Sequence, residues 1–213
     1  KHVLMLSPDE SLKESHRHLS NAMAICPLYL YRYDDNQEII DATVLDYEFL
    51  GTGMWVGFSF VWMSHLYSIQ RNGEGAYEQL RIFWESFCSP NGFHLNGDYK
   101  KRGYTTFHYR PFTLESNMYA ADALQEMLFQ MRDGKMDLFS AIPEKWKQEG
   151  VAFEGFRGEK GILVSAKKIP KEGCYVTITA SSEDEIQIYT AGKFAQELHL
   201  SAGETIELFI KED

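Results

Sequence analysis

The spacing of apolar residues along the chain changes character near residue 134. Before that point, apolar residues recur at intervals of three and four, which is the period of an amphipathic helix. This spacing predicts five helices, over residues 19–30, 38–50, 58–69, 76–87 and 115–130. The fifth helix is apolar on nearly every face, so we expect it to be buried on most sides. The polar segment 91–111 predicts a loop long enough to suggest a function or a lid.

After Asp133-Gly134 the apolar segments are short, rich in β-branched residues and separated by turn residues. They predict strands over residues 136–141, 151–157, 162–168, 175–180, 185–190 and 205–210. Helices followed by strands are typical of an α+β protein or of two domains. We therefore predict an α+β multidomain fold, with a helical domain over residues 1–135 and a small antiparallel β-domain over residues 136–213.

Composition and charge limit the classes of partner. The chain is 44% hydrophobic and carries a net charge of −10, which disfavours nucleic acid and anionic membranes as partners. No apolar run approaches the ~20 residues of a membrane span. The three cysteines are odd in number and far apart, so they predict neither a disulfide framework nor a metal site. We expect no metal and no cofactor.

The segment Ser15-His16-Arg17-His18-Leu19-Ser20 carries the most distinctive chemistry. Two imidazoles and a guanidinium within three residues offer a planar fork of donors and two groups that either donate or accept. Such a set suits a ring of hydroxyls or an anion. The alternative interpretation is the solvated start of a helix.

Seven segments, in conserved order over nearly the whole chain, resemble motifs of one enzyme family. They are His16–Ser20 (HRHLSH in the family), Gly57–Trp62 (GWSxAW), Gly73–Leu80 (DGxRAYELL), Pro111–Asn117 (PFQIDGN), Leu124–Leu128 (AEMLLQ), Asp133–Trp146 (DGxIxLLPALPxxW) and Leu200–Thr205 (LKAGET). Together they resemble the C-terminal part of glycoside hydrolase family 95, the α-L-fucosidase and α-L-galactosidase family.

This resemblance implies a fold and an activity. The helices would form part of an (α/α)6 barrel of the six-hairpin glycosidase type, followed by a small β-sandwich-like domain. The whole enzyme would hydrolyse a terminal α-linked sugar, fucose- or galactose-like, with inversion, and its partner would be an oligosaccharide or glycan. The family's general acid, a Glu, lies upstream of this segment, so we expect the chain to need the N-terminal half of the barrel and to be inactive alone. The resemblance favours a periplasmic or secreted location, although no targeting signal is visible.

The resemblance also assigns candidate site residues. Glu115 stands where the family has the Asp that activates the attacking water, and a carboxylate at a helix start is held ionised, as a base requires. Arg17 and His18 match positions that bind sugar hydroxyls, and His16 would orient them. Because Glu is one methylene longer than Asp, either the pocket has re-formed around another sugar or the activity is lost. The second possibility is a non-catalytic carbohydrate-binding or interaction protein on a degenerate glycosidase scaffold.

Two further candidates are weighed against structural roles. Asn117 matches the family's Asn and would bond near Glu115 or cap its helix. Trp55 is a candidate platform for a sugar face, whereas Trp62 lies on a buried stripe and is expected in the core. We predict that Arg17, His18 and Glu115 line one polar cavity with the 91–111 loop at its rim. The β-domain lacks an evident cluster of exposed aromatics, so it is predicted to be structural.

Overall fold

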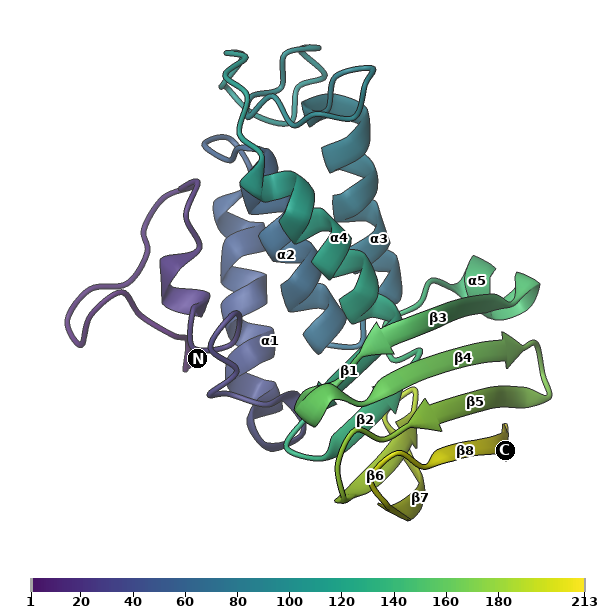
Figure 1. Cartoon of the computed structure of the whole chain (residues 1–213). Helices are drawn as coiled ribbons and strands as arrows, with labels where there is room; N and C mark the ends of the chain where they lie inside the picture. Colours follow the sequence, from purple (N-terminus) through teal and green to yellow (C-terminus); the bar gives the residue numbers. More distant parts are fainter. Residues whose placement is uncertain (1, 213) are drawn as a thin grey trace. The chain divides into compact units, whose positions relative to one another are not determined.

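The computed structural model describes residues 2–212 and divides into two compact units, Lys1–Leu124 and Gln125–Asp213. We call them the helical unit and the β unit. The helical unit contains α1 (Tyr33–Leu50), α2 (Gly57–Ile69) and α3 (Gly73–Ile82), which is continued by a π-helical turn over Phe83–Phe87 (Figure 1). The helix α4 (Glu115–Leu128) begins in the helical unit and ends in the β unit.

Four of the five predicted helices are confirmed, and the first is wrong. Residues 19–30 form only a 3₁₀ turn over Ser20–Ala22, followed by irregular turns. Pro27 lies inside the run, and a proline within a helix removes a backbone hydrogen bond and clashes with the preceding turn. The apolar side chains with helical spacing, such as Leu19 and Cys26, are nevertheless buried.

The central element of the helical unit is α2. Twelve of its 13 residues are buried, including the polar residues Ser64 and Ser68. Ser64 Oγ donates to the Ala76 carbonyl at 2.9 Å, and Ser68 Oγ donates to the Ser64 carbonyl at 3.0 Å. These bonds satisfy the hydroxyls, so the helix tolerates burial on every side.

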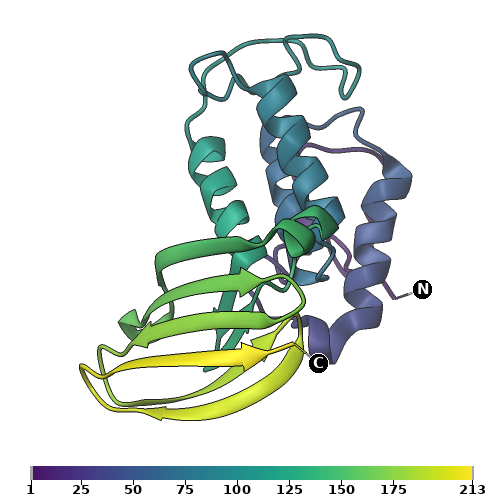
Figure 2. The same cartoon turned by 90° about the vertical axis from the view of Figure 1, so that its right-hand side faces the viewer.

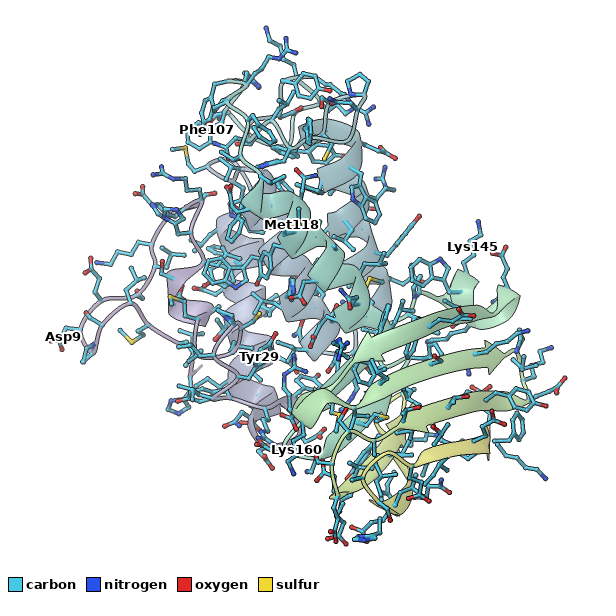
Figure 3. The ribbon with its side chains drawn as sticks, in the orientation of Figure 1. Asp9, Tyr29, Phe107, Met118, Lys145 and Lys160 are labelled. Atoms are coloured by element: carbon cyan, nitrogen blue, oxygen red, sulfur yellow. The ribbon has the colours of Figure 1, made fainter. Side chains whose placement is uncertain are left out.

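The expectation that residues 115–130 are buried on most sides is wrong. Met118 on α4 is 63% exposed (Figure 3), and Ala121 and Asp122 are exposed as well. The helix also ends at Leu128, and the next four residues form the strand β1 (Phe129–Arg132). Asp133 and Gly134, with φ of 48° and 73°, form the two-residue turn that leads from β1 into β2 (Lys135–Leu138).

The predicted loop is confirmed: residues 89–114 contain no helix or strand beyond a single bridge between Cys88 and His94. The loop is fixed internally rather than extended into solvent. The buried carboxylate of Asp98 accepts the Gly103 amide at 2.9 Å, and Thr105 Oγ1 donates to the Trp55 carbonyl at 2.6 Å. The first bond closes the loop on itself, and the second holds it against the segment that precedes α2.

The β unit consists of two four-stranded sheets, ordered β1-β2-β6-β7 and β3-β4-β5-β8 (Figures 1 and 2). Its remaining elements are α5 (Glu144–Glu149), β3 (Val151–Arg157), β4 (Leu163–Ile169), β5 (Gly173–Thr179), β6 (Asp184–Thr190), β7 (Lys193–Leu200) and β8 (Thr205–Lys211). All six predicted strands are present, whereas β1, β7 and α5 were not predicted. The expectation of a purely antiparallel arrangement is wrong in one place, because β2 pairs with β6 in parallel.

Apolar side chains from both sheets form one core in the β unit. Leu138 and Ile188 from the first sheet and Val164 and Ile178 from the second are all completely buried. The unit therefore has its own hydrophobic core, consistent with an α+β organisation of the chain.

Candidate functional site

The helices α2 and α4 begin at the same end of the helical unit (Figure 1). His94, in the loop before α4, contacts both starts. Its backbone amide donates to Asn117 Oδ1 in the first turn of α4 at 2.9 Å. Its ring lies directly against Gly57, the first residue of α2, where an added Cβ would overlap Nε2 and lie 2.7 Å from Cδ2. His94 thus joins the two helix N-termini.

The His94 ring is completely buried and is held by the residue two positions before Glu115. Its Nδ1 lies 2.7 Å from Oγ1 and 3.0 Å from the carbonyl oxygen of Thr113, whereas its Nε2 is buried without a hydrogen-bond partner. Burial lowers the pKa of His94, and the hydrogen bond to Thr113 and the negative charge of Glu115 oppose that shift. The ring is therefore neutral at neutral pH.

Glu115 is the first residue of α4 and is exposed. Its carboxylate makes no hydrogen bond or ion pair with any residue between 2 and 212. Glu115 is an exposed carboxylate available to a ligand or a water molecule.

Asn117 connects α4 to the loop rather than capping the helix. Its Oδ1 accepts the His94 amide, and its Nδ2 donates to the Gly92 carbonyl at 2.8 Å. Both ends of the side-chain amide are therefore used to fix residues 92–94. This places Asn117 beside Glu115 as a residue that positions the loop.

The His16-Arg17-His18 segment is exposed and anchored at the same end of the helical unit. Ser59 Oγ, in the first turn of α2, donates to the Arg17 carbonyl at 2.6 Å. The His16 Nδ1 accepts the His18 amide at 3.1 Å, and the two rings meet edge to face with centroids 5.3 Å apart. These contacts fix the backbone and leave the Arg17 guanidinium and the His18 ring exposed to solvent.

Desolvation, followed by the electrostatic interaction with Arg17 and His16, lowers the pKa of His18. The imidazole is then neutral at neutral pH. A neutral imidazole has one donor and one acceptor nitrogen, which suits a hydroxyl group that both donates and accepts. Arg17 next to it supplies donors only.

The structure brings most of the predicted site residues to one region. The Arg17 carbonyl is bonded to the first turn of α2. Glu115 lies two residues after Thr113, which holds the His94 ring where it packs against that same turn. Trp55 differs, because it is only 3% exposed and its ring meets Phe60 edge to face at 5.1 Å. Trp55 is therefore part of the core of the helical unit and presents no ring face to a ligand.

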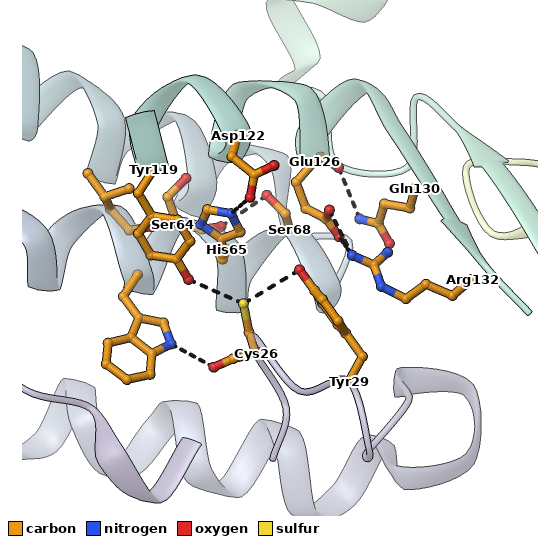
Figure 4. A network of polar contacts seen from close by, with 12 residues as sticks. Cys26, Tyr29, Ser64, His65, Ser68, Tyr119, Asp122, Glu126, Gln130 and Arg132 are labelled. Carbon is orange, nitrogen blue, oxygen red and sulfur yellow. Dashed lines mark hydrogen bonds and ion pairs between the residues drawn. The ribbon is translucent and has the colours of Figure 1, made fainter. Parts of the chain in front are cut away.

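A polar network holds the segment that follows His18 (Figure 4). The buried ring of His65 on α2 donates or accepts at 2.9 Å with Asp122 Oδ2 on α4, and it stacks on Tyr119 at 4.0 Å. The Tyr119 hydroxyl lies 3.3 Å from Cys26 Sγ, and Trp62 Nε1 donates to the Cys26 carbonyl at 2.9 Å. The network fixes residues 23–29 to α2 and α4 without a helix of their own, and it confirms Trp62 as a core residue.

Sequence reasoning missed His94, which is the residue that joins the two helix starts. It lies in a polar loop without apolar periodicity, so no pattern distinguished it from a solvated histidine. Among residues 2–212, no three His, Cys, Asp or Glu side chains are grouped to hold a metal ion. None of the described helices is long and apolar enough to cross a membrane.

Comparisons with known proteins agree with the sequence motifs. The model of the glycosyl hydrolase family 95 catalytic domain matches residues 5–128. Alpha-L-fucosidase 2 of Arabidopsis thaliana is 26% identical over 153 residues, which are 71% of this chain and 18% of the plant protein. The chain thus spans less than a fifth of the length of that relative. The matched range of the family model contains His16–His18 and Glu115.

Proposed function

This chain belongs to glycosyl hydrolase family 95, and on that premise we propose that it forms the C-terminal portion of a glycosidase. The complete enzyme removes a terminal α-linked sugar, fucose- or galactose-like, from a glycan with inversion at the anomeric carbon. The helical unit supplies part of an (α/α)6 barrel and one side of the active site. The rest of the barrel supplies the general acid.

One observation carries this proposal: the exposed groups that suit sugar chemistry lie at one end of the helical unit. Arg17 and the neutral His18 ring offer donors and an acceptor for hydroxyl groups. Glu115 offers a carboxylate at the start of α4. In the proposed reaction this carboxylate takes a proton from a water molecule, whose oxygen attacks the anomeric carbon from the face opposite the leaving group.

Exposed apolar side chains support the proposal that further structure packs on the helical unit. Leu45 and Phe49, one turn apart on α1, are 46% and 87% exposed, and Met118 on α4 is 63% exposed. Large exposed apolar side chains in groups mark surfaces that bind a partner. In the proposed enzyme the remaining barrel helices cover them.

The test uses a longer chain in which the residues that precede this segment in its gene are restored. We expect it to hydrolyse an aryl α-L-fucoside or α-galactoside, and Glu115→Gln to lower kcat by about 10²–10⁴-fold. The matched control is Glu38→Gln, because Glu38 is an exposed glutamate near the start of α1 and not at the start of α2 or α4. Proton NMR of the first product sugar reports its anomer and therefore inversion or retention.

We expect the 213-residue chain alone to be inactive, since the family resemblance places the general acid upstream of this segment. Turnover by that chain would contradict the proposed division of the machinery. A longer chain that binds the glycan without hydrolysing it, with or without Glu115, would favour the non-catalytic function instead.

A further inference from the structure

We propose that the β unit contains a second saccharide site, which binds a sugar carrying a carboxylate or sulfate group. The site is a cavity of about 450 Å³ whose lining residues all belong to the β unit. It lies at one end of the two sheets, where β4 and β8 end and β5 and β7 begin. Its volume falls within the range of roughly 300–1,000 Å³ that is typical of small-molecule sites.

The charge of the cavity is opposite to that of the chain. Four lysines and a single acidic residue line it: Lys147, Lys168, Lys193, Lys211 and Glu212. The chain as a whole carries a net charge of −10, so the lysines give this cavity a positive potential on an otherwise negative protein. Such a local positive potential concentrates anions at the cavity.

Two of these cations are available to a ligand. The Lys168 ammonium pairs with the Glu212 carboxylate at 2.9 Å, and that of Lys147 pairs with Glu144 at 3.6 Å. Lys193 and Lys211 are exposed and form no ion pair with another residue of the described chain. The buried Cys174 thiol in the lining adds no negative charge, because burial raises its pKa to about 11.

Aromatic rings beside these lysines suit the apolar face of a sugar. Phe194 and Phe209 line the cavity and are 58% and 38% exposed. The Phe209 ring packs against Tyr175, itself 57% exposed, with centroids 4.7 Å apart. No cluster of exposed aromatics was evident from the sequence, because Tyr175, Phe194 and Phe209 lie on three different strands, β5, β7 and β8.

The combination of aromatic rings, lysines and neutral polar groups indicates the class of ligand. Rings alone would suit a neutral sugar, and lysines alone would suit a free anion such as phosphate. Thr190 and Gln196 add neutral polar groups to the lining, which suit hydroxyls. Exposed aromatic rings, neutral polar groups and two lysines without an ion pair among the described residues together match a saccharide with an acidic substituent.

The experiment measures binding to the full 213-residue chain by isothermal titration calorimetry. The probes are a galacturonic acid trimer, a sulfated galactose trimer and the neutral galactose trimer. We expect the galacturonate to bind saturably and at least tenfold more tightly than the neutral trimer. The sulfated trimer reports whether carboxylate or sulfate is the preferred anion.

Variants locate the binding. We expect the double substitution Lys193→Gln and Lys211→Gln to weaken galacturonate binding about tenfold, since two partly exposed cations lose their interaction with the ligand. We expect Phe194→Ala to weaken it as well. The matched control is Lys135→Gln, because Lys135 is an exposed lysine at the opposite end of β2 from the lining residue Leu138.

Three results would overturn the proposal. The first is equal binding of the neutral and acidic trimers, and the second is equal weakening by the Lys135 control. The third is binding of benzoate as tight as that of galacturonate, which would show that the cavity takes acids without regard to the sugar. The inference does not depend on hydrolysis, because Glu115→Gln leaves this cavity intact and is expected to bind galacturonate unchanged.

Discussion

The substitution Gly57→Ala tests whether His94 joins the two helix starts. In an ordinary helix, replacing glycine by alanine stabilises by up to about 1 kcal/mol. At Gly57 the new Cβ would overlap His94 Nε2 and lie 2.7 Å from Cδ2 and 3.0 Å from the Phe87 Cβ. The buried ring has no open space to enter, because Thr113 holds its other side.

Overpacking of this kind costs about 1–3 kcal/mol and exceeds the intrinsic gain. We therefore expect Gly57→Ala to lower the free energy of unfolding by about 1–2 kcal/mol, with Tm lower by roughly 2–8 °C for a chain of this size. The assay is urea denaturation followed by tryptophan fluorescence. Trp55 and Trp62 are buried in the helical unit and report its unfolding.

The matched control is Gly53→Ala, because a Cβ there meets nothing within 4 Å and the φ angle is not positive. We expect that variant to be neutral or slightly stabilised. Adding His94→Ala to Gly57→Ala removes the clash, so the two changes together should cost less than the sum of the single changes. A neutral or stabilising effect of Gly57→Ala would refute the contact between the His94 ring and α2. It would also refute the role of His94 in joining the starts of α2 and α4.

Three further predictions concern His94, Asn117 and the cysteines. Burial lowers the pKa of His94 below its usual 6.5, so the unfolded state binds more protons than the folded state below that pH. The free energy of unfolding should therefore fall as the pH drops below about 6.5. This pH dependence should weaken in His94→Asn. Asn117→Ala removes the bonds to the His94 amide and the Gly92 carbonyl, and we expect a loss of about 1–2 kcal/mol together with faster hydrogen exchange at residues 92–94. The three cysteines are buried and form no disulfide, so native protein should not react with a thiol reagent until denaturant is added. Prompt labelling of one thiol would contradict its burial.

Local sequence patterns were sufficient to predict an element wherever one apolar period persisted over several helical turns or over a whole strand. The apolar spacing of α2 and α3 and the β-branched runs of β4 and β5 reflect the faces that these elements bury. Those patterns failed where a single residue overrides the period. Pro27 prevented a helix at 19–30, and the Asp133-Gly134 turn converted the end of a predicted helix into the strand β1.

The sequence by itself determined the family, the order of helices before strands and the exposed groups suited to sugar chemistry, because motifs and periods are local properties. Only the tertiary structure decided which side chains meet. It buried Trp55 against Phe60, set the His94 ring between Gly57 and Thr113, and brought Lys193 and Lys211 to one cavity. These contacts join residues distant along the chain, and their geometry follows from packing of whole helices and sheets, which no single stretch of sequence specifies.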